Sequence, residues 1–361
     1  MKQFGDLYSG KRVLVTGHTG FKGSWLCLWL KELGAEVVGI SLAPETRPNH
    51  WSLLRFDSII DNFYLDIRDA NDVAKTFEAN QPEIVFHLAA QPLVRRSYRN
   101  PLETWSTNVM GTANILEACR KTKSVQAIVV VTTDKCYENR EWAWGYREND
   151  RLGGHDPYSA SKSGSELVAA SYRNAFFSTE GLPLLATARA GNVIGGGDWS
   201  DDRLIPDLVR AISSQQSLEI RLPNATRPWQ HVLEPLCGYL LLGQNLLLGD
   251  RQFEGSWNFG PEYTGNRTVN EVLDILCNSW GNIQWHRTNA TQPHEANLLF
   301  LDSTKACTQL GWQSIWGFEA TLKKTVDWYR AYLEGNAVIS HQQLSDFIQD
   351  AQNAQVSWIR I

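Results

Sequence analysis

Tyr158 and Lys162 are four positions apart in the stretch DPYSASK, and this pair of residue types suits proton chemistry. Residues four apart lie on one face of a helix, so the lysine ammonium can approach the tyrosine hydroxyl. A neighbouring positive charge favours the phenolate, and we therefore expect Lys162 to lower the phenol pKa from about 10 and make Tyr158 a usable base. By itself the pair is also common on ordinary helix surfaces, so its neighbours decide the interpretation.

A second group of polar residues follows the apolar run 127–131 without a break. Thr132, Thr133, Asp134 and Lys135 come next, in the order TTDK. Ligands of open α/β sheets bind beyond the carboxyl ends of the strands, so these hydroxyl, carboxylate and ammonium groups are candidates for chemistry. The alternative is that the aspartate and lysine form a surface ion pair, which would contribute only about 0–1 kcal/mol.

Three glycines, Gly17, Gly20 and Gly23, lie between the first predicted strand and its helix. In a dinucleotide-binding turn the first glycine permits a tight turn, the second lets the backbone approach a pyrophosphate, and the third allows close helix–strand packing. The pyrophosphate would lie at the amino end of the helix, where free N–H groups and the helix dipole favour an anion. The whole loop is a predicted cofactor contact: Gly17, His18, Thr19, Gly20, Phe21, Lys22 and Gly23.

These groups require a framework that brings strand ends together, and the hydrophobic pattern predicts one. From residue 12 onward, short apolar strands alternate with helices whose apolar residues recur three and four apart, and the first helix is expected to end at Gly34. Such alternation predicts a parallel sheet with helices on both faces, that is, a doubly wound α/β Rossmann domain. After residue 191 the pattern loosens, which predicts a smaller α/β lobe for the substrate.

The predicted boundaries follow from this change of pattern. Residues 1–191 and about 229–257 are expected to form the dinucleotide-binding domain, because a predicted helix in the second segment returns to the first sheet. Residues 192–228 and 258–335 are expected to form the substrate lobe, and 336–361 a C-terminal tail with a short amphipathic helix.

The overall composition argues against several classes of partner. The chain has 361 residues, of which 43% are hydrophobic and 20% charged, as is typical of a globular protein. A net charge of -5 and the lack of a basic run argue against nucleic acid or an acidic membrane as a partner. No apolar run is long enough to cross a bilayer and the six cysteines lack metal-like spacing, so we expect a cytoplasmic protein with reduced thiols and no metal site.

Beyond these local patterns, the chain resembles the extended short-chain dehydrogenase/reductase family along almost its whole length. The resemblance rests on the motifs TGHTGFKG, HLAAQP, TNVMGT, TTDK, YSASK and RAGNVIG. Within that family the sequence is most similar to the nucleotide-sugar 4,6-dehydratases, through FHLAAQPLVRRSY, TDKCYENREWAWGYREND, AGNVIGGGDW and RPWQHVLEPL. The resemblance implies an NAD-dependent lyase that acts on a nucleotide-diphosphate glucose.

The reaction that the resemblance implies has three coupled steps. Tyr158 takes the proton of the sugar's 4-hydroxyl while a hydride passes from C4 to NAD⁺, with Thr133 bonded to the 4-oxygen. The 4-keto group acidifies C5–H, and water leaves across C5 and C6, with Asp134 as the acid that protonates the departing 6-hydroxyl. The hydride then returns to C6, which gives a 4-keto-6-deoxy sugar and regenerates NAD⁺.

The same resemblance implies which side chains line the binding sites. Lys162 is expected to bond the nicotinamide ribose, and Asp66 and Ile67 to contact adenine. The nicotinamide side is expected to be lined by Leu88, Ala89, Ala90, Gln91, Asn108 and Thr132. The nucleotide diphosphate or base is expected to contact Asn192, Leu204, Arg227 and His294. That the base is cytosine, and that the protein is a homodimer or homotetramer, rests on the resemblance alone.

Two positions depart from what is usual in such proteins. The second strand ends at Ser41 instead of the carboxylate that usually binds the adenosine ribose, and no arginine is present there for a 2′-phosphate, so we expect NAD with a loosely held adenosine end. Lys135 takes the place of a glutamate that removes the C5 proton in thymidine- and guanosine-linked relatives. Lys135 is expected either to take this proton as a free amine in a closed pocket or to stay charged and stabilise the enolate.

Two other functions fit parts of the same pattern. A nucleotide-sugar 4-epimerase would need Tyr158 and Lys162 but no acid–base pair for elimination, so Asp134 and Lys135 argue against it. A non-catalytic dinucleotide-sensing module would have no use for Tyr158, Lys162 and Thr133 together. The products separate the three: a 4-keto sugar, a galacto-sugar, or no product.

Overall fold

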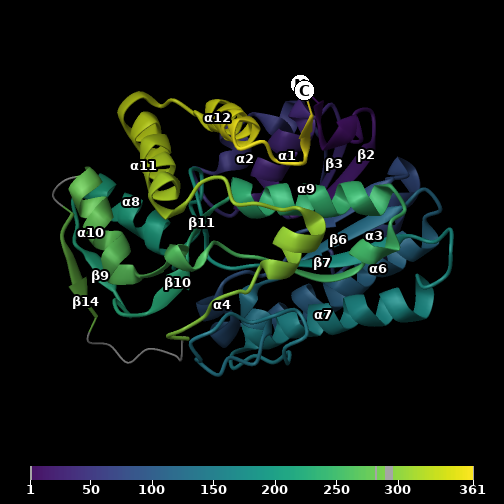
Figure 1. Ribbon diagram of the computed structural model, residues 1–361, viewed down its shortest axis with the longest axis horizontal. Coiled ribbons are helices and arrows are strands. Elements are labelled where there is room, and N and C mark those ends of the chain that lie inside the picture. The colour runs from purple at the N-terminus through teal and green to yellow at the C-terminus, as the bar shows by residue number, and fades with distance from the viewer. Residues whose placement is uncertain (1, 281–282, 289–295, 361) are drawn as a thin grey trace.

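The computed structural model describes residues 2–280, 283–288 and 296–360, and its largest element is a seven-stranded parallel sheet (Figure 1). Its strands are β2 (Arg12–Thr16), β3 (Glu36–Ser41), β4 (Asp61–Tyr64), β5 (Ile84–His87), β6 (Ala127–Val131), β7 (Leu184–Ala190) and β12 (Gly255–Phe259). They follow the order β12-β7-β6-β5-β2-β3-β4, and every neighbouring pair is parallel. The predicted doubly wound α/β fold is confirmed.

The sheet is buried on both faces, because successive residues of each strand point to opposite sides. In β2, Val13 and Val15 belong to one hydrophobic core and Leu14 to another. The first core includes α1 (Phe21–Glu32) and α9 (Leu233–Leu247). The second core includes three helices on the opposite face: α3 (Ala70–Asn80), α6 (Gly111–Lys121) and α7 (Pro157–Phe176), of which α7 is seen below β6 and β7 in Figure 1.

The chain reverses its direction across the sheet next to β2. It passes from β2 outward to β3 and β4, and then crosses back to β5 on the other side of β2. In open α/β sheets such a switch point leaves a crevice at the carboxyl ends of the two central strands. Gly17 follows β2, and Ala89 follows β5. The two residues are so close that a Cβ at Gly17 would lie 2.7 Å from the Ala89 nitrogen.

Local sequence signals set the ends of the two helices that matter most for the site. The helix α7 begins after Asp156, whose carboxylate accepts hydrogen bonds from the Ser159 backbone nitrogen (3.0 Å) and hydroxyl (2.6 Å), and Pro157 occupies the first turn. The helix α1 ends just before Gly34, which has a positive φ of 76°. The predicted glycine at this helix end is confirmed.

Most elements of the second half gather at one end of the molecule, at the left of Figure 1. They are α8 (Leu204–Ser214), β9 (Leu218–Ile220), β10 (Thr226–Pro228), β13 (Asn266–Thr268), α10 (Val269–Trp280) and β14 (Trp285–Arg287). The strands pair only with one another, β9 with β14 and β10 with β13. The helix α9 instead packs on β6 and β7 of the large sheet. The division of the chain into two domains with these boundaries stays a prediction.

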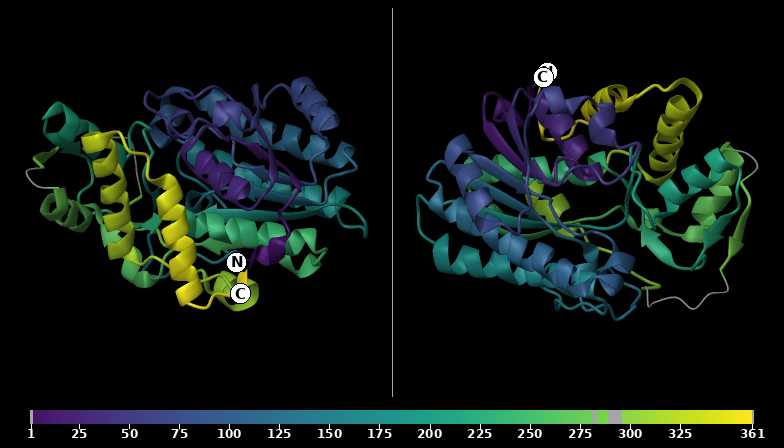
Figure 2. Two further views of the ribbon diagram at one scale, coloured as in Figure 1. Left: turned by 90° about the horizontal axis from the view of Figure 1, so that it is seen from above. Right: turned by 180° about the vertical axis from the view of Figure 1, so that it is seen from behind.

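The C-terminal segment packs back onto the N-terminal part of the chain. It contains α11 (Phe318–Gly335), α12 (Ser340–Asn353) and β15 (Ile359–Arg360), which pairs antiparallel with β1 (Lys2–Gln3). Trp358 is buried and stacks on Phe4 with ring centroids 4.9 Å apart. Figure 2 shows the two termini side by side and α12 near α1. The helix expected in this tail is present.

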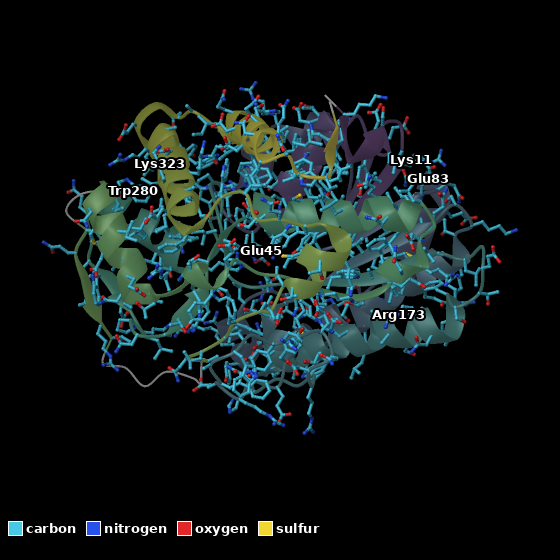
Figure 3. The ribbon with its side chains drawn as sticks, in the orientation of Figure 1. Lys11, Glu45, Glu83, Arg173, Trp280 and Lys323 are labelled. Atoms are coloured by element: carbon cyan, nitrogen blue, oxygen red, sulfur yellow. The ribbon has the colours of Figure 1, made fainter. Side chains whose placement is uncertain are left out.

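The two ends of the sheet differ in their side chains. At the amino ends of β2 and β5, Lys11 and Glu83 form an ion pair of 2.7 Å. Glu45, in the loop after β3, pairs instead with Arg96 at 2.9 Å, and Figure 3 shows it well apart from Lys11 and Glu83. Among the described residues, no helix is both long and apolar enough to span a membrane.

Candidate active site

A cavity of about 770 Å³ runs along the carboxyl ends of the strands and continues into the second half of the chain. Gly17 and Asp66 line it at the sheet end, and Arg227 lines it at the other end. Between them the wall is formed by both candidate chemical groups of the sequence, which lie on different elements: Thr132, Thr133, Asp134 and Lys135 after β6, and Tyr158 and Lys162 on α7. The structure therefore brings the two groups into one site.

Thr133 connects these two groups. Its hydroxyl donates a hydrogen bond of 2.9 Å to Oδ1 of Asp134. It also interacts with the phenol of Tyr158 and lowers the pKa of that phenol. All three side chains are buried, with relative exposures of 6% for Thr133, 0% for Asp134 and 8% for Tyr158. The phenol, the hydroxyl and the carboxylate thus lie close together in the wall of the cavity.

The pKa of Tyr158 differs from the expectation. Burial raises the pKa of its phenol to about 12, and the hydrogen bond with Thr133 lowers it only in part. Asp134 raises it further, because a nearby carboxylate disfavours the phenolate. Lys162 is not among the largest causes of this shift. The prediction that Lys162 sets a low phenol pKa is therefore wrong for this structure, since loss of water outweighs any effect of the ammonium.

Lys162 is itself buried, and two opposing effects act on the pKa of its ammonium group. Its Nζ donates a hydrogen bond of 3.2 Å to the carbonyl of Val131, the last residue of β6. Burial lowers the pKa of its ammonium to about 8, while the carboxylate of Glu166 raises it. Glu166 lies one helical turn beyond Lys162 on α7. Its charge therefore helps to keep Lys162 protonated near neutral pH.

Positively charged side chains surround the carboxylate of Asp134 in the cavity. Its Oδ2 has no hydrogen-bond partner among the described residues, and Nζ of Lys135 lies 3.7 Å from its Oδ1. Lys22, from the glycine-rich loop, is within electrostatic reach of Asp134, Lys135, Lys162 and Arg203. Burial and the neighbouring cations lower the pKa of Lys22 to about 7. A buried carboxylate with a free oxygen, surrounded by cations, is suited to bind a polar group of a ligand.

A buried ion pair behind the site was not found from the sequence. Glu166 and Arg189 are both 2% exposed in their side chains and are joined at 2.7 Å. Glu166 also accepts the hydroxyls of Thr132 and Thr187, and Arg189 donates to Tyr137 at 2.7 Å. This network holds the end of β6 against α7 and β7. No spacing in the sequence relates Glu166 to Arg189, so only the fold reveals the pair.

The glycine-rich loop forms a cradle without side chains, which fits a dinucleotide. A Cβ at Gly23 would lie 2.1 Å from the Gly17 carbonyl oxygen, so helix α1 and the end of β2 are packed as closely as the motif predicts. Gly20 lines the cavity, and a Cβ there would come no closer than 3.3 Å to this oxygen. Thr19, Phe21 and Lys22 also line the cavity, together with these glycines. The loop and the amino end of α1 could therefore hold a pyrophosphate.

Two predicted cofactor contacts do not lie in the wall of the cavity. The ring of His18 is fully buried beneath the loop, where its Nε2 is 2.7 Å from Oδ1 of Asn62. Asn108 is also fully buried, and its amide accepts from the Gln91 nitrogen (2.8 Å) and donates to the Ser161 hydroxyl (2.8 Å). Both side chains support the loops that form the wall.

The remaining predicted cofactor residues lie in the wall as expected, namely Asp66, Ile67, Leu88, Ala89, Ala90, Gln91 and Thr132. The end of β3 presents Ser41, whose hydroxyl is 2.8 Å from that of Thr19. Glu45 lines the cavity nearby, but its carboxylate pairs with Arg96. The carboxylate usually found at this strand end is thus replaced by a buried serine.

The far end of the cavity contains arginines that can bind a diphosphate. Asn192, Leu204 and Arg227 line it, as predicted, whereas His294 lies outside the described residues. Three further arginines at this end of the cavity were not singled out from the sequence: Arg95, Arg203 and Arg221. Ion pairs with Asp198 and Asp202 neutralise part of their positive charge. Isolated arginines carry no spacing signal, and for that reason the sequence did not reveal them.

The described residues contain no group of three His, Cys, Asp or Glu side chains that could hold a metal ion. All six cysteines of the chain are free thiols. Burial raises the pKa of the Cys136 thiol, which lies next to the strand-end cluster, so this cysteine is not a nucleophile at neutral pH. Hydroxyl, carboxylate and ammonium groups of Thr133, Asp134 and Lys135 line the cavity beside this cysteine.

Comparison with known proteins gives a consistent result. A family model described as GDP-mannose 4,6 dehydratase matches residues 14–254. The CDP-glucose 4,6-dehydratase of Salmonella typhimurium is 47% identical over 350 residues, which cover 95% of this chain and 98% of that protein.

Two solved structures share the fold. The dTDP-glucose 4,6-dehydratase of Streptomyces venezuelae, solved with NAD bound, has a TM-score of 0.76 at 25% identity and covers 90% of this chain and 97% of its own. The UDP-glucose 4-epimerase of Thermotoga maritima has a TM-score of 0.77 at 22% identity and covers 89% of this chain and 99% of its own. The second similarity concerns the fold alone, so the fold does not separate dehydratase from epimerase.

The cradle predicts the effect of one added methyl group. Gly23→Ala should displace the loop, because its Cβ would lie 2.1 Å from the Gly17 oxygen, and NAD⁺ affinity should fall by at least about tenfold for a packing cost of about 1–3 kcal/mol. Calorimetric titration with NAD⁺ measures this. Gly335→Ala is the control, since a Cβ there has nothing within 4 Å. Equal NAD⁺ affinity of Gly23→Ala and the unmodified protein would contradict the cradle.

Proposed function

Because this chain belongs to the GDP-mannose 4,6-dehydratase family, we propose that it dehydrates CDP-glucose to CDP-4-keto-6-deoxyglucose with NAD as its cofactor. The observation that carries the proposal is a buried carboxylate, Asp134, joined through Thr133 to Tyr158 and lying 3.7 Å from Lys135. Oxidation of an alcohol needs only a base such as Tyr158. Elimination of water needs an acid and a base as well, and this site contains both types of group.

Each of these residues has a distinct task in the proposed reaction. Tyr158 takes the proton of the 4-hydroxyl, and Thr133 lies beside the 4-oxygen. Asp134 protonates the 6-hydroxyl as it leaves, and Lys135 takes the proton from C5. Bound NAD⁺ supplies the redox chemistry, since it accepts hydride from C4 and returns it to C6. Lys162, buried behind Tyr158, holds a positive charge beside the reacting centre and bonds the nicotinamide ribose.

Substrate and cofactor occupy opposite ends of the cavity in this proposal. The glycine-rich cradle would hold the cofactor, and Asp66 and Ile67 would contact its adenine. The substrate's diphosphate lies among the arginines of the far end, including Arg203 and Arg227, and Asn192 and Leu204 contact the nucleotide. The buried wall excludes water from the sugar, which strengthens every charge interaction there. Because all six cysteines are free thiols, a reducing compartment such as the cytoplasm suits the protein.

The epimerase alternative shares Tyr158 and Lys162 with this proposal, and the fold is compatible with both. An epimerase needs the sugar to turn over between two hydride transfers and has no water to eliminate. It would gain nothing from a buried acid beside an ammonium group on the same wall. The 47% identity to a dehydratase over 95% of the chain also favours elimination.

A panel of nucleotide sugars tests the function directly. CDP-, dTDP-, UDP- and GDP-glucose are each incubated with the protein and NAD⁺, and the products are analysed by mass spectrometry and NMR. CDP-glucose should be lost fastest, with a 4-keto-6-deoxy product lighter by one water. A galacto-sugar of unchanged mass would indicate an epimerase, and no change with any of the four would leave only a binding role.

Variants of Lys135 test its part in elimination. Lys135→Met should still permit oxidation at C4 but stall the loss of water, so that reduced cofactor accumulates on the enzyme, with turnover lower by about 10²–10⁴-fold. If Lys135 is the base, Lys135→Glu should retain part of the activity and Lys135→Arg should not, because a guanidinium stays charged. The reverse order would assign it an electrostatic role. Normal turnover of Lys135→Met would contradict both roles.

The protein is further proposed to form homodimers through the outer face of α7 and the segment that precedes α6. This segment contains α5 (Pro101–Trp105) and a π-helical turn (Ser106–Met110). Large apolar side chains are exposed on these elements: Leu102, Trp105, Met110, Leu167 and Phe176. Gly164 on α7 brings the two elements together, since a Cβ there would lie 3.6 Å from the Trp105 ring. Such exposed apolar groups are typical of an interface.

Sedimentation velocity tests this interface with a matched pair of variants. Leu167 and Leu248 are both 61% exposed, but Leu248 follows α9 on the opposite side of the sheet. Leu167→Glu should convert the dimer, or a tetramer built from it, into smaller species, because a charge in the interface loses its water. Leu248→Glu should leave the assembly unchanged. An unmodified protein that sediments as a monomer would contradict the proposal.

A further inference from the structure

In the proposed dehydration the 4-hydroxyl of the sugar loses a proton, and the residue roles given so far do not determine where this proton goes. The sugar segment CH(OH)–CH–CH₂OH becomes C(=O)–CH–CH₃ and one water. The hydrogen on C4 ends on C6, and the proton removed from C5 is restored. One proton therefore leaves the 4-hydroxyl at Tyr158, and one proton must be added to the departing 6-hydroxyl at Asp134. The balance closes if the first proton becomes the second.

The structure contains a direct connection between these two residues. The Thr133 hydroxyl donates to Oδ1 of Asp134 at 2.9 Å and also interacts with the phenol of Tyr158, which lines the same wall of the cavity. All three side chains are less than a tenth exposed, so the connection runs through protein groups and not through bulk water. Oδ2 of Asp134 has no hydrogen-bond partner among the described residues, which leaves it available for the 6-hydroxyl of the sugar.

We propose that Thr133 passes a proton from Tyr158 to Asp134 during oxidation at C4, so that the acid needed for elimination is made by the oxidation itself. As the phenol accepts the proton of the 4-hydroxyl, its own proton moves to the Thr133 oxygen, and the Thr133 proton moves to Asp134. Three O–H bonds form and three break. Asp134 ends neutral and able to protonate the leaving hydroxyl. This inference rests on the proposed function.

The resting state of the site favours such a relay. With a pKa of about 12, the Tyr158 phenol carries its proton at neutral pH and cannot accept another until it gives this one up. A phenol is a far weaker acid than a carboxylic acid, so the transfer is unfavourable on its own. It becomes favourable when the C4–H bond breaks, because the 4-hydroxyl then becomes strongly acidic. The relay and the oxidation therefore occur together.

A proton count tests the relay in the unmodified protein. CDP-6-deoxyglucose lacks the 6-hydroxyl, so the reaction stops after oxidation at C4. Reduced nicotinamide is followed by absorbance, and released protons by an indicator dye in weak buffer, with the change on binding CDP subtracted. At about pH 6, below the pKa values of Lys22 (about 7) and Lys162 (about 8), neither lysine takes up a proton.

The expected result is reduced cofactor without an equivalent release of protons, because the proton stays on Asp134. Release of one proton for each reduced cofactor would overturn the relay, since it would show that Tyr158 delivers its proton to water. Protonated Asp134 gives a second readout that does not depend on turnover: infrared difference spectra of the stalled complex should show a new carboxylic acid band, absent in Asp134→Asn.

A matched pair of variants isolates the hydroxyl of Thr133. Thr133→Val keeps the shape of the side chain but loses the hydroxyl, whereas Thr133→Ser keeps it. The valine variant should form reduced cofactor about 10²-fold more slowly and release one proton for each, while the serine variant, which keeps the hydroxyl, should form reduced cofactor without an equivalent release of protons. Unchanged rate and proton count in a folded valine variant, as judged by thermal melting, would overturn the relay.

Failure of the relay is distinct from failure of the proposed function. A protein that forms the 4-keto-6-deoxy product but releases protons during oxidation at C4 is a dehydratase without the relay. A protein that forms no such product from any nucleotide-glucose lacks the proposed function, and the relay is then rejected with it.

Discussion

The buried ion pair between Glu166 and Arg189 is the constraint on which the site depends. It joins α7 to β7, and through Thr132 it also fixes the end of β6. Breaking such a pair by removing one partner typically costs about 3–5 kcal/mol, because the remaining charge stays buried without compensation. Thr133 and Asp134 directly follow Thr132, and Lys162 lies one turn before Glu166. The pair therefore sets both the distance between the two catalytic elements and the charge on Lys162.

Positive charge distinguishes this cavity from an ordinary buried crevice. Lys22, Lys135, Lys162 and Arg203 all act on the space around Asp134, and burial keeps their charges poorly screened. Such a site stabilises an anion that forms within it, here the enolate at C4, as well as the diphosphate that remains bound. Burial has the opposite effect on Tyr158, whose phenol is held neutral. In the proposed relay, base and acid are both generated during the reaction, and for that reason the position of Thr133 between Tyr158 and Asp134 matters.

Local sequence patterns were sufficient to predict the framework and the two candidate groups that meet in the cavity. The short apolar strands, the glycine that ends α1 and the order TTDK after β6 are local signals, and parallel topology then places strand ends together. The Glu166–Arg189 pair and the arginines of the far end depend on contacts between distant segments, so no local pattern reveals them. The pKa of Tyr158 was predicted in the wrong direction, because spacing shows neighbours but not loss of water. For the same reason the sequence did not show that the side chains of His18 and Asn108 are fully buried.

The central claim is that one site oxidises, eliminates and reduces the same sugar without releasing it. CDP-glucose that carries deuterium at C4 tests this most directly, with the product examined by NMR. The account predicts that the deuterium appears at C6 of the 4-keto product, in the same molecule, with no net reduced cofactor at the end of the reaction. Loss of the label to solvent, or one reduced cofactor for each sugar converted, would contradict the account.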